Sequence, residues 1–188
     1  MKWMIASDLH GSAYYTAQLL EAYAKEQAER LILLGDLLYH GPRNALPKEY
    51  DPQGVITMLN AHSQSLLCVR GNCDTEVDQM VLTFPILAEY AILSVGSHLI
   101  FATHGHHFHS NQLPPIQPHN ILLHGHTHIP CCRQYDTHRY CNPGSVSIPK
   151  EGSVHSYMTM EDTILRWKSL SGKEYHCCDL GAAALPVL

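Results

Sequence analysis

Long apolar runs are absent from this sequence, and none approaches the roughly 20 residues that a membrane-spanning helix needs. The pattern of a signal peptide is also missing, because the charged Lys2 is followed by only five uncharged residues before Asp8. Positive charge is scarce, with 12 Lys and Arg against 17 Asp and Glu. We therefore expect a cytoplasmic protein that binds neither membranes nor nucleic acid, except a nucleotide as a small substrate.

Paired cysteine motifs are lacking as well. The seven cysteines form an odd set without two CxxC motifs, which disfavours a disulfide framework and a zinc ribbon. We interpret them as reduced structural thiols, including the adjacent pairs Cys131-Cys132 and Cys177-Cys178. A chain of 188 residues suits one domain, residues 1–188, that folds without such crosslinks.

Histidine is abundant, with 15 residues, and several follow short apolar runs. These runs, at 3–7, 31–34, 66–69, 99–102 and 121–123, are of strand length and end just before residues that commonly ligate metals. Those residues are Asp8, His10, Asp36, Asn72, His104, His126 and His128. His124 directly follows the last run, before Gly125, so we expect it to pack in the core or beside the ligands and not to bind a metal.

The first half of the chain alternates strands and helices. Strands are expected at 2–7, 31–34 and 66–69, with helices at 12–30 and 51–62 between them and a loop at 39–50. The expected helix caps are Ser12 and Asp51, the latter followed by Pro52. Thr75 and Asp78 resemble a capping box for a short helix that ends before Pro85. The carboxyl ends of the parallel strands then share one sheet edge.

The second half is richer in strands. We expect strands at 90–95, 99–103, 121–123 and 135–140, and a hairpin of 163–170 and 173–180 with a two-residue turn at Ser171-Gly172. This pattern indicates a second sheet. The apolar segment 181–188 is expected on a sheet edge or against another subunit, which would make a homo-oligomer.

Two carboxylates, a carboxamide and four imidazoles at one edge suffice for two metal ions if one carboxylate bridges them. Oxygen and imidazole ligands without thiolate suit Mn²⁺, Fe²⁺ or Zn²⁺. The order Asp8-x-His10, Gly35-Asp36, Gly71-Asn72, His104, Gly125-His126-x-His128 resembles the calcineurin-like metallophosphoesterase superfamily. Within it, the segments 71–74 (Gly-Asn-Cys-Asp), 125–128 (Gly-His-Thr-His) and 142–145 (Asn-Pro-Gly-Ser) are similar to those of the YfcE-type phosphodiesterases.

The resemblance implies an α/β fold, a four-layer αββα sandwich of two mixed β-sheets, and a phosphodiesterase with a small phosphodiester substrate. It implies two divalent ions, with manganese expected from the family and zinc or iron as alternatives. One ion would bind Asp8, His10, Asp36 and His128, and the other Asp36, Asn72, His104 and His126. The catalytic set around a bridging water would be Asp36, Asn72 and His104. Substrate would contact Asn72 and the loop residues Arg43 and Asn44.

Cys73 and Asp74 lie near this site, and Cys73 departs from the pattern of many phosphatases of the superfamily. Those enzymes carry at this place a histidine that protonates the leaving group. A thiol with a pKa of about 8.5 is a poor acid for an alkoxide. We therefore expect a preference for diesters with good leaving groups, with phosphomonoester hydrolysis as the alternative.

Two alternative functions differ from this hypothesis. The first alternative is a metallo-β-lactamase, whose HxHxDH motif is similar to the segment 104–109 (His-Gly-His-His-Phe-His). However, Phe108 replaces the aspartate of that motif, and the motif would leave Asp8, Asp36 and Asn72 without a role. We expect His106, His107 and His109 to form a solvated turn. A protein-binding scaffold, like the retromer subunit of the same superfamily, is the non-enzymatic alternative, and the complete ligand set favours catalysis.

Overall fold

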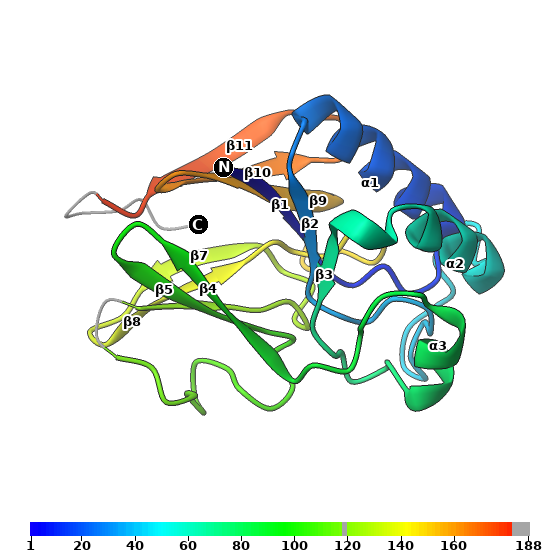
Figure 1. The fold of residues 1–188 in the computed structure, drawn as a ribbon, viewed down its shortest axis with the longest axis horizontal. Coiled ribbons are helices and arrows are strands. Elements are labelled where there is room, and N and C mark those ends of the chain that lie inside the picture. Colours follow the sequence, from blue (N-terminus) through cyan, green and yellow to red (C-terminus); the bar gives the residue numbers. More distant parts are fainter. Residues whose placement is uncertain (118–119, 182–188) are drawn as a thin grey trace.

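Two β-sheets pack face to face, as Figure 1 shows for the computed structural model, which describes residues 1–117 and 120–181. The six-stranded sheet has the order β11-β10-β9-β1-β2-β3. In it, β1, β2 and β3 are parallel to one another, whereas β9, β10 and β11 each pair antiparallel with their neighbours. Its strands are β1 (Lys2–Ala6), β2 (Arg30–Leu33), β3 (Leu66–Cys68), β9 (Ser156–Glu161), β10 (Ile164–Ser169) and β11 (Glu174–Asp179).

The five-stranded sheet has the order β4-β5-β6-β8-β7, with β5, β6 and β8 parallel. Its strands are β4 (Tyr90–Val95), β5 (His98–Thr103), β6 (Asn120–Leu123), β7 (Cys131–Gln134) and β8 (His138–Asn142). The core between the sheets includes Ile5, Leu34, Ile121 and the fully buried Trp167. Both sheets are mixed, which confirms the predicted α/β class with two mixed sheets.

The helices are α1 (Ala13–Glu26), α2 (Pro52–Ala61), α3 (Glu76–Val81) and the 3-10 turn η1 (Ser63–Ser65). All three expected caps are present: Ser12 and Asp51 accept backbone N–H groups, and Thr75 forms a capping box with Asp78. α1 and α2 pack on the outer face of the six-stranded sheet, where Leu19 and Leu59 join its core.

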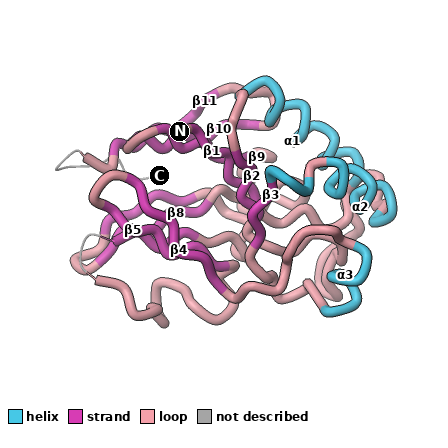
Figure 2. Tube along the Cα trace, viewed as in Figure 1, coloured by secondary structure: helices cyan, strands magenta, loops and turns pink. Residues whose placement is uncertain are grey.

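The outer face of the five-stranded sheet carries only loops, as Figure 2 shows. Within residues 1–117 and 120–181, no helix lies between β4 and β11. Helices therefore cover one outer face, where the expected four-layer sandwich has them on both. In the same part of the chain, no helix has both the length and the apolar composition needed to cross a bilayer.

Three expectations for the second half need correction. The predicted strand 135–140 is correct only for residues 138–140, which lie in β8, because residues 135–137 form the turn between β7 and β8. β9 was not expected at all. The hairpin of β10 and β11 is confirmed, but its loop spans residues 170–173 instead of two residues. The segment expected at 181–188 falls outside the described residues after Gly181.

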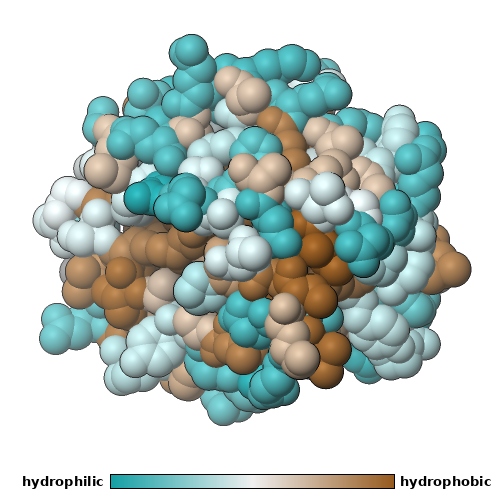
Figure 3. All heavy atoms as spheres, turned by 45° about the vertical axis from the view of Figure 1, so that its right-hand side comes forward, coloured by the Kyte–Doolittle hydropathy of each residue, from teal (hydrophilic) through white to brown (hydrophobic). Residues whose placement is uncertain are grey.

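Hydrophobic atoms gather in a band across the face seen in Figure 3, between hydrophilic areas. An apolar cleft of about 650 Å³ also lies where the edges of the two sheets approach, and its walls include Trp3 of β1, Leu67 of β3 and Leu93 of β4.

Candidate metal centre

Loops that follow five strands meet at one edge of the two sheets. Asp8 and His10 follow β1, Asp36 follows β2 and Asn72 follows β3. From the five-stranded sheet come His104 after β5, and His126 and His128 after β6. The parallel direction of β1 to β3, and of β5 with β6, places these loops on the same side.

Five of these seven residues have a left-handed backbone. The φ angles are 60° at Asp8, 47° at His10, 56° at Asp36, 65° at His126 and 64° at His128. This conformation costs free energy for residues other than glycine, and such positions concentrate at functional sites. The loops therefore turn sharply inward to present these side chains.

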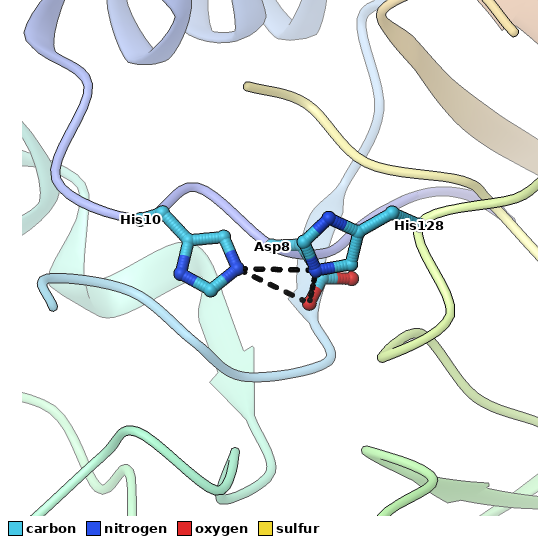
Figure 4. Close-up of side chains that lie close together, drawn as sticks. All are labelled: Asp8, His10 and His128. Carbon is cyan, nitrogen blue, oxygen red and sulfur yellow. Dashed lines mark hydrogen bonds and ion pairs between the residues drawn. The ribbon is translucent and has the colours of Figure 1, made fainter. Parts of the chain in front are cut away.

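One group of side chains is drawn in Figure 4, which shows Asp8, His10 and His128 pointing toward one another. His10 Nε2 lies 3.2 Å from His128 Nε2, and Asp8 Oδ1 lies 3.4 Å from His128 Nε2 and 3.7 Å from His10 Nε2. All three residues are buried. Their nitrogen and oxygen atoms surround one small volume suited to a single cation.

A second group surrounds His104. Its Nε2 lies 3.0 Å from Asn72 Oδ1, 3.1 Å from His126 Nδ1 and 3.4 Å from Asp36 Oδ2. Asp36 Oδ2 is also 3.7 Å from His10 Nε2 in the first group. Asp36 therefore lies between the two groups, where one carboxylate can serve both.

Backbone carbonyls orient three of the imidazoles. Nδ1 of His10, His104 and His128 lies 2.8, 2.6 and 2.7 Å from the carbonyl oxygens of Tyr39, Leu34 and Ile148, respectively. Because a carbonyl only accepts, Nδ1 must carry the proton. In the neutral ring, Nε2 is then free to bind a cation.

Asp74 supports the loop that carries Asp36. Its carboxylate accepts the backbone N–H groups of Asp36, Leu37 and Gly71 at 2.7 to 2.9 Å. The N–H of Cys73 in turn donates to Asp36 Oδ1 at 2.8 Å. The loops after β2 and β3 are thus tied together directly beneath the two groups.

Residues 142–148 support the remaining loops. Ser145 and Ser147 donate their hydroxyls to the carbonyl of Asp8, and Asn142 Nδ2 donates to the carbonyl of Gly125. Gly125 packs so closely that a Cβ there would lie 1.9 Å from Ser7 Oγ, so any larger residue would separate the two sheets at this point. Asn142 and Ser145 thus give the segment 142–145 a supporting role beside the site.

Electrostatics favour a cation here. Burial opposes ionisation of Asp8 and Asp36, but neighbouring histidines outweigh it and lower the pKa of both carboxyls. Burial likewise opposes protonation of His104, yet Asp36 raises its pKa to about 9, so a cation must displace a proton there. Burial lowers the pKa of His10 and His126.

Asp8 Oδ1 is buried without a hydrogen-bond donor from any described residue. A carboxylate oxygen in that position is costly unless a positive charge meets it. The oxygen and imidazole atoms around it are ligands that Mn²⁺, Fe²⁺ and Zn²⁺ all accept. The residues therefore fit a pair of divalent ions.

A cleft of about 420 Å³ opens over the two groups. The residues that line it include Arg43, Asn44 and Cys73, which the sequence predicted in or near the site, and also Lys150. Lys150 was not expected as a site residue, and its only sequence signal is that it is a cation following the run 145–149. Burial raises the pKa of the Cys73 thiol, and Asp36 adds to that rise.

The other histidines divide by environment. His124 is buried, with its ring stacked on Tyr140 at 4.5 Å. His107 is exposed and lies 3.4 Å from Glu89 Oε2. Residues 105–108 form a bend, and His106 and His109, which are partly exposed, line a second hollow beside His126.

Comparisons with known proteins agree with this geometry. The profile of the calcineurin-like phosphoesterase superfamily domain matches residues 1–163. Phosphodiesterase YfcE of Escherichia coli K12 is 46% identical over 165 residues, which cover 88% of this chain and 90% of that protein. The solved structure of the E. coli phosphoesterase YfcE has a TM-score of 0.92 and 42% identity, covering 96% of this chain and 100% of that one. Vps29 of Chaetomium thermophilum has a TM-score of 0.61 and 16% identity, covering 100% and 97%, a likeness of fold alone.

Proposed function

Because this chain belongs to the calcineurin-like phosphoesterase superfamily, we propose that it is a dimetal-dependent phosphodiesterase that acts on small phosphodiesters through a metal-activated water. The convergence of all seven ligand-type residues, with Asp36 between the two groups, carries the proposal. One ion is assigned to Asp8, His10, Asp36 and His128, and the other to Asp36, Asn72, His104 and His126. Manganese is the expected metal, with zinc and iron as alternatives.

Two bound divalent ions supply Lewis acidity, which polarises the phosphate and lowers the pKa of a water molecule towards neutrality. The protein side chains position the reacting groups and provide charge that attracts the substrate. Asp36, Asn72 and His104 hold the reacting centre, and Asn72 also faces the cleft. Arg43 and Lys150 line the same cleft and attract the anionic substrate, while the amide of Asn44 donates to the carbonyl of His40 and shapes the loop.

Two alternatives make different predictions. A phosphomonoesterase would prefer p-nitrophenyl phosphate to bis(p-nitrophenyl) phosphate. A protein-binding scaffold would bind metal without turning over either compound. The expected cytoplasmic location and homo-oligomeric state belong to the same proposal and are tested by cell fractionation and by light scattering.

The Asp36→Asn variant tests the proposal. Asparagine tolerates the left-handed backbone at this position but cannot supply a bridging charge, so metal binding should be lost with the fold intact. We expect kcat/KM for bis(p-nitrophenyl) phosphate to fall by about 100-fold or more, since dimetal catalysis contributes several kcal/mol. Metal content is measured by mass spectrometry and fold by circular dichroism.

Asp162→Asn is the matched control, because Asp162 also has a left-handed backbone, with φ 51°, but lies in the exposed turn between β9 and β10. It should keep both metal and activity. Full activity in Asp36→Asn would rule out the dimetal assignment.

A further inference from the structure

A second hollow lies beside the metal centre, on the other side of His126. We call it the histidine pocket, and it has a volume of about 390 Å³, close to the 420 Å³ of the cleft. It is lined by Gly105, His106, His109, Ser110, His124, His126, Thr127 and Tyr140. His126 also lines the cleft, so this proposed metal ligand borders both cavities.

The floor of the histidine pocket is built from packed rings. His124 and Tyr140 are buried and stack with ring centroids 4.5 Å apart, and Tyr140 Oη accepts a hydrogen bond from Asn142. Gly105, with φ +114°, lies against this floor, where a Cβ would be 2.4 Å from His124 Nδ1. The absence of a side chain at 105 lets the chain turn tightly over His124.

The wall is formed by His106. Its ring centroid lies 5.4 Å from that of His104 and 6.3 Å from that of His126. His106 Nδ1 and His124 Nε2 are buried without a hydrogen-bond partner among the described residues. The rings of His106, His124 and Tyr140 therefore border the hollow, together with the hydroxyl-bearing residues Ser110 and Thr127.

The two cavities differ in charge. Arg43 and Lys150 line the cleft, whereas the residues that line the histidine pocket include no Asp, Glu, Lys or Arg. Its polar groups are imidazoles and the hydroxyls of Ser110, Thr127 and Tyr140. An uncharged, planar group that can stack and accept or donate hydrogen bonds fits these surroundings.

A phosphodiester carries two substituents on phosphorus, and a monoester carries one. Cys73, at the place where related phosphatases have their acid, lines the cleft, which is the side on which a leaving group would be protonated. Building on the proposed function, we propose that the histidine pocket binds the ester substituent that stays on the phosphate, and that it selects an uncharged planar ring. A monoester leaves this pocket empty, which gives the site its preference for diesters.

The test compares two diesters with the same leaving group. Bis(p-nitrophenyl) phosphate retains an aromatic ring after the reaction, and methyl p-nitrophenyl phosphate retains only a methyl group. In the manganese-loaded enzyme, His106→Ala should lower the ratio of kcat/KM for the first substrate over the second by about 3- to 10-fold, mainly through KM, as expected for one aromatic contact. His106→Phe keeps a ring and should retain most of the ratio.

His107→Ala is the control, since His107 is exposed and lines neither cavity. It should leave the ratio at the wild-type value. An unchanged ratio in His106→Ala, or an equal loss on both substrates, would overturn the assignment of the pocket while leaving the phosphodiesterase intact. Absence of wild-type turnover on both diesters would overturn the proposed function and this inference with it.

Discussion

The side chain of Cys73 lines the cleft, but its thiol is a weak acid. It is 8% exposed, and Asn72 Nδ2 donates to its Sγ at 3.2 Å. Burial and the charge of Asp36 raise the pKa of the thiol, so it holds its proton more firmly than a free cysteine. The thiol is thus a weaker acid here than the sequence alone indicates.

Cys73→His should restore acid assistance to the leaving group. General acid catalysis typically contributes at least about 100-fold, and an imidazole in a site not shaped for it should recover about 10-fold of that. The gain should appear in kcat for diesters with alkyl leaving groups and be small for p-nitrophenyl esters, which leave without help. Cys73→Ser, which removes the thiol without adding an acid of suitable pKa, is the matched control.

The readout is the slope of log kcat against leaving-group pKa for the manganese-loaded proteins. A flatter slope in Cys73→His than in wild type is expected. Identical slopes at equal metal content would contradict a missing acid as the origin of the substrate preference.

At the scale of elements, Glu26 attaches the end of α1 to three strands. Its carboxylate accepts hydrogen bonds from Lys2 of β1 at 2.6 Å, Lys168 of β10 at 2.7 Å and Tyr157 of β9 at 2.8 Å. Burial opposes ionisation, but these donors outweigh it and lower the pKa of Glu26 to about 2. Two ammonium groups and one carboxylate, with the Glu26 side chain 10% exposed, form a network that solvent screens only in part.

Glu26→Gln should lower the free energy of unfolding by about 2 kcal/mol at pH 7. Because the folded pKa lies below the unfolded value, the stabilisation is complete above about pH 5 and declines as the pH falls from there toward 2. The difference between wild type and variant in urea unfolding should therefore shrink at pH 3. Glu21→Gln, at an exposed position of the same helix, should show no difference at either pH.

Elements with a clear local signal were predictable from the sequence. Capping residues and strand-ending glycines act within a few residues, so α1, α2, α3 and β1 to β3 were located correctly. The turn at 135–137 could not be predicted because Tyr135 and Thr137 both favour strands, and the reversal of the chain there shows only in the antiparallel pairing of β7 with β8. β9 could not be predicted because side chains on both its faces are buried, Tyr157 in the core under the helices and Met158 in the core between the sheets, which removes the alternation that marks a surface strand.

The site, like the fold, was predictable where the signal is local in the sequence. The seven ligand-type residues stood at strand ends and could be proposed from spacing. The participation of Lys150 and the histidine pocket depends on how loops from different strands lie against one another, which no local pattern encodes.

For the whole molecule, metal binding should be coupled to stability. The unfolded chain cannot hold residues from five loops in place, so ions that bind the folded form stabilise it. Manganese at about 100 times its Kd should add about 2.7 kcal/mol, which raises the melting temperature by roughly 5–10 °C for a chain of this size. Thermal unfolding with added manganese or with EDTA measures the shift.

Asp36→Asn should melt at nearly the same temperature with manganese and with EDTA. An equal manganese response in this variant and in wild type would place the stabilising ions elsewhere.

β1 lies at the centre of the six-stranded sheet, and its neighbours come from distant parts of the chain. Ile5 is paired with Ile32 of β2 on one side and with Met158 of β9 on the other. On the ribosome, β1 and β2 can pair early, but one edge of β1 stays unpaired until β9 has been synthesised. His126 and His128 also come late in the sequence, so the complete centre cannot form before residue 128 has been synthesised. Both the six-stranded sheet and the proposed metal site therefore close only when segments far apart in the sequence come together.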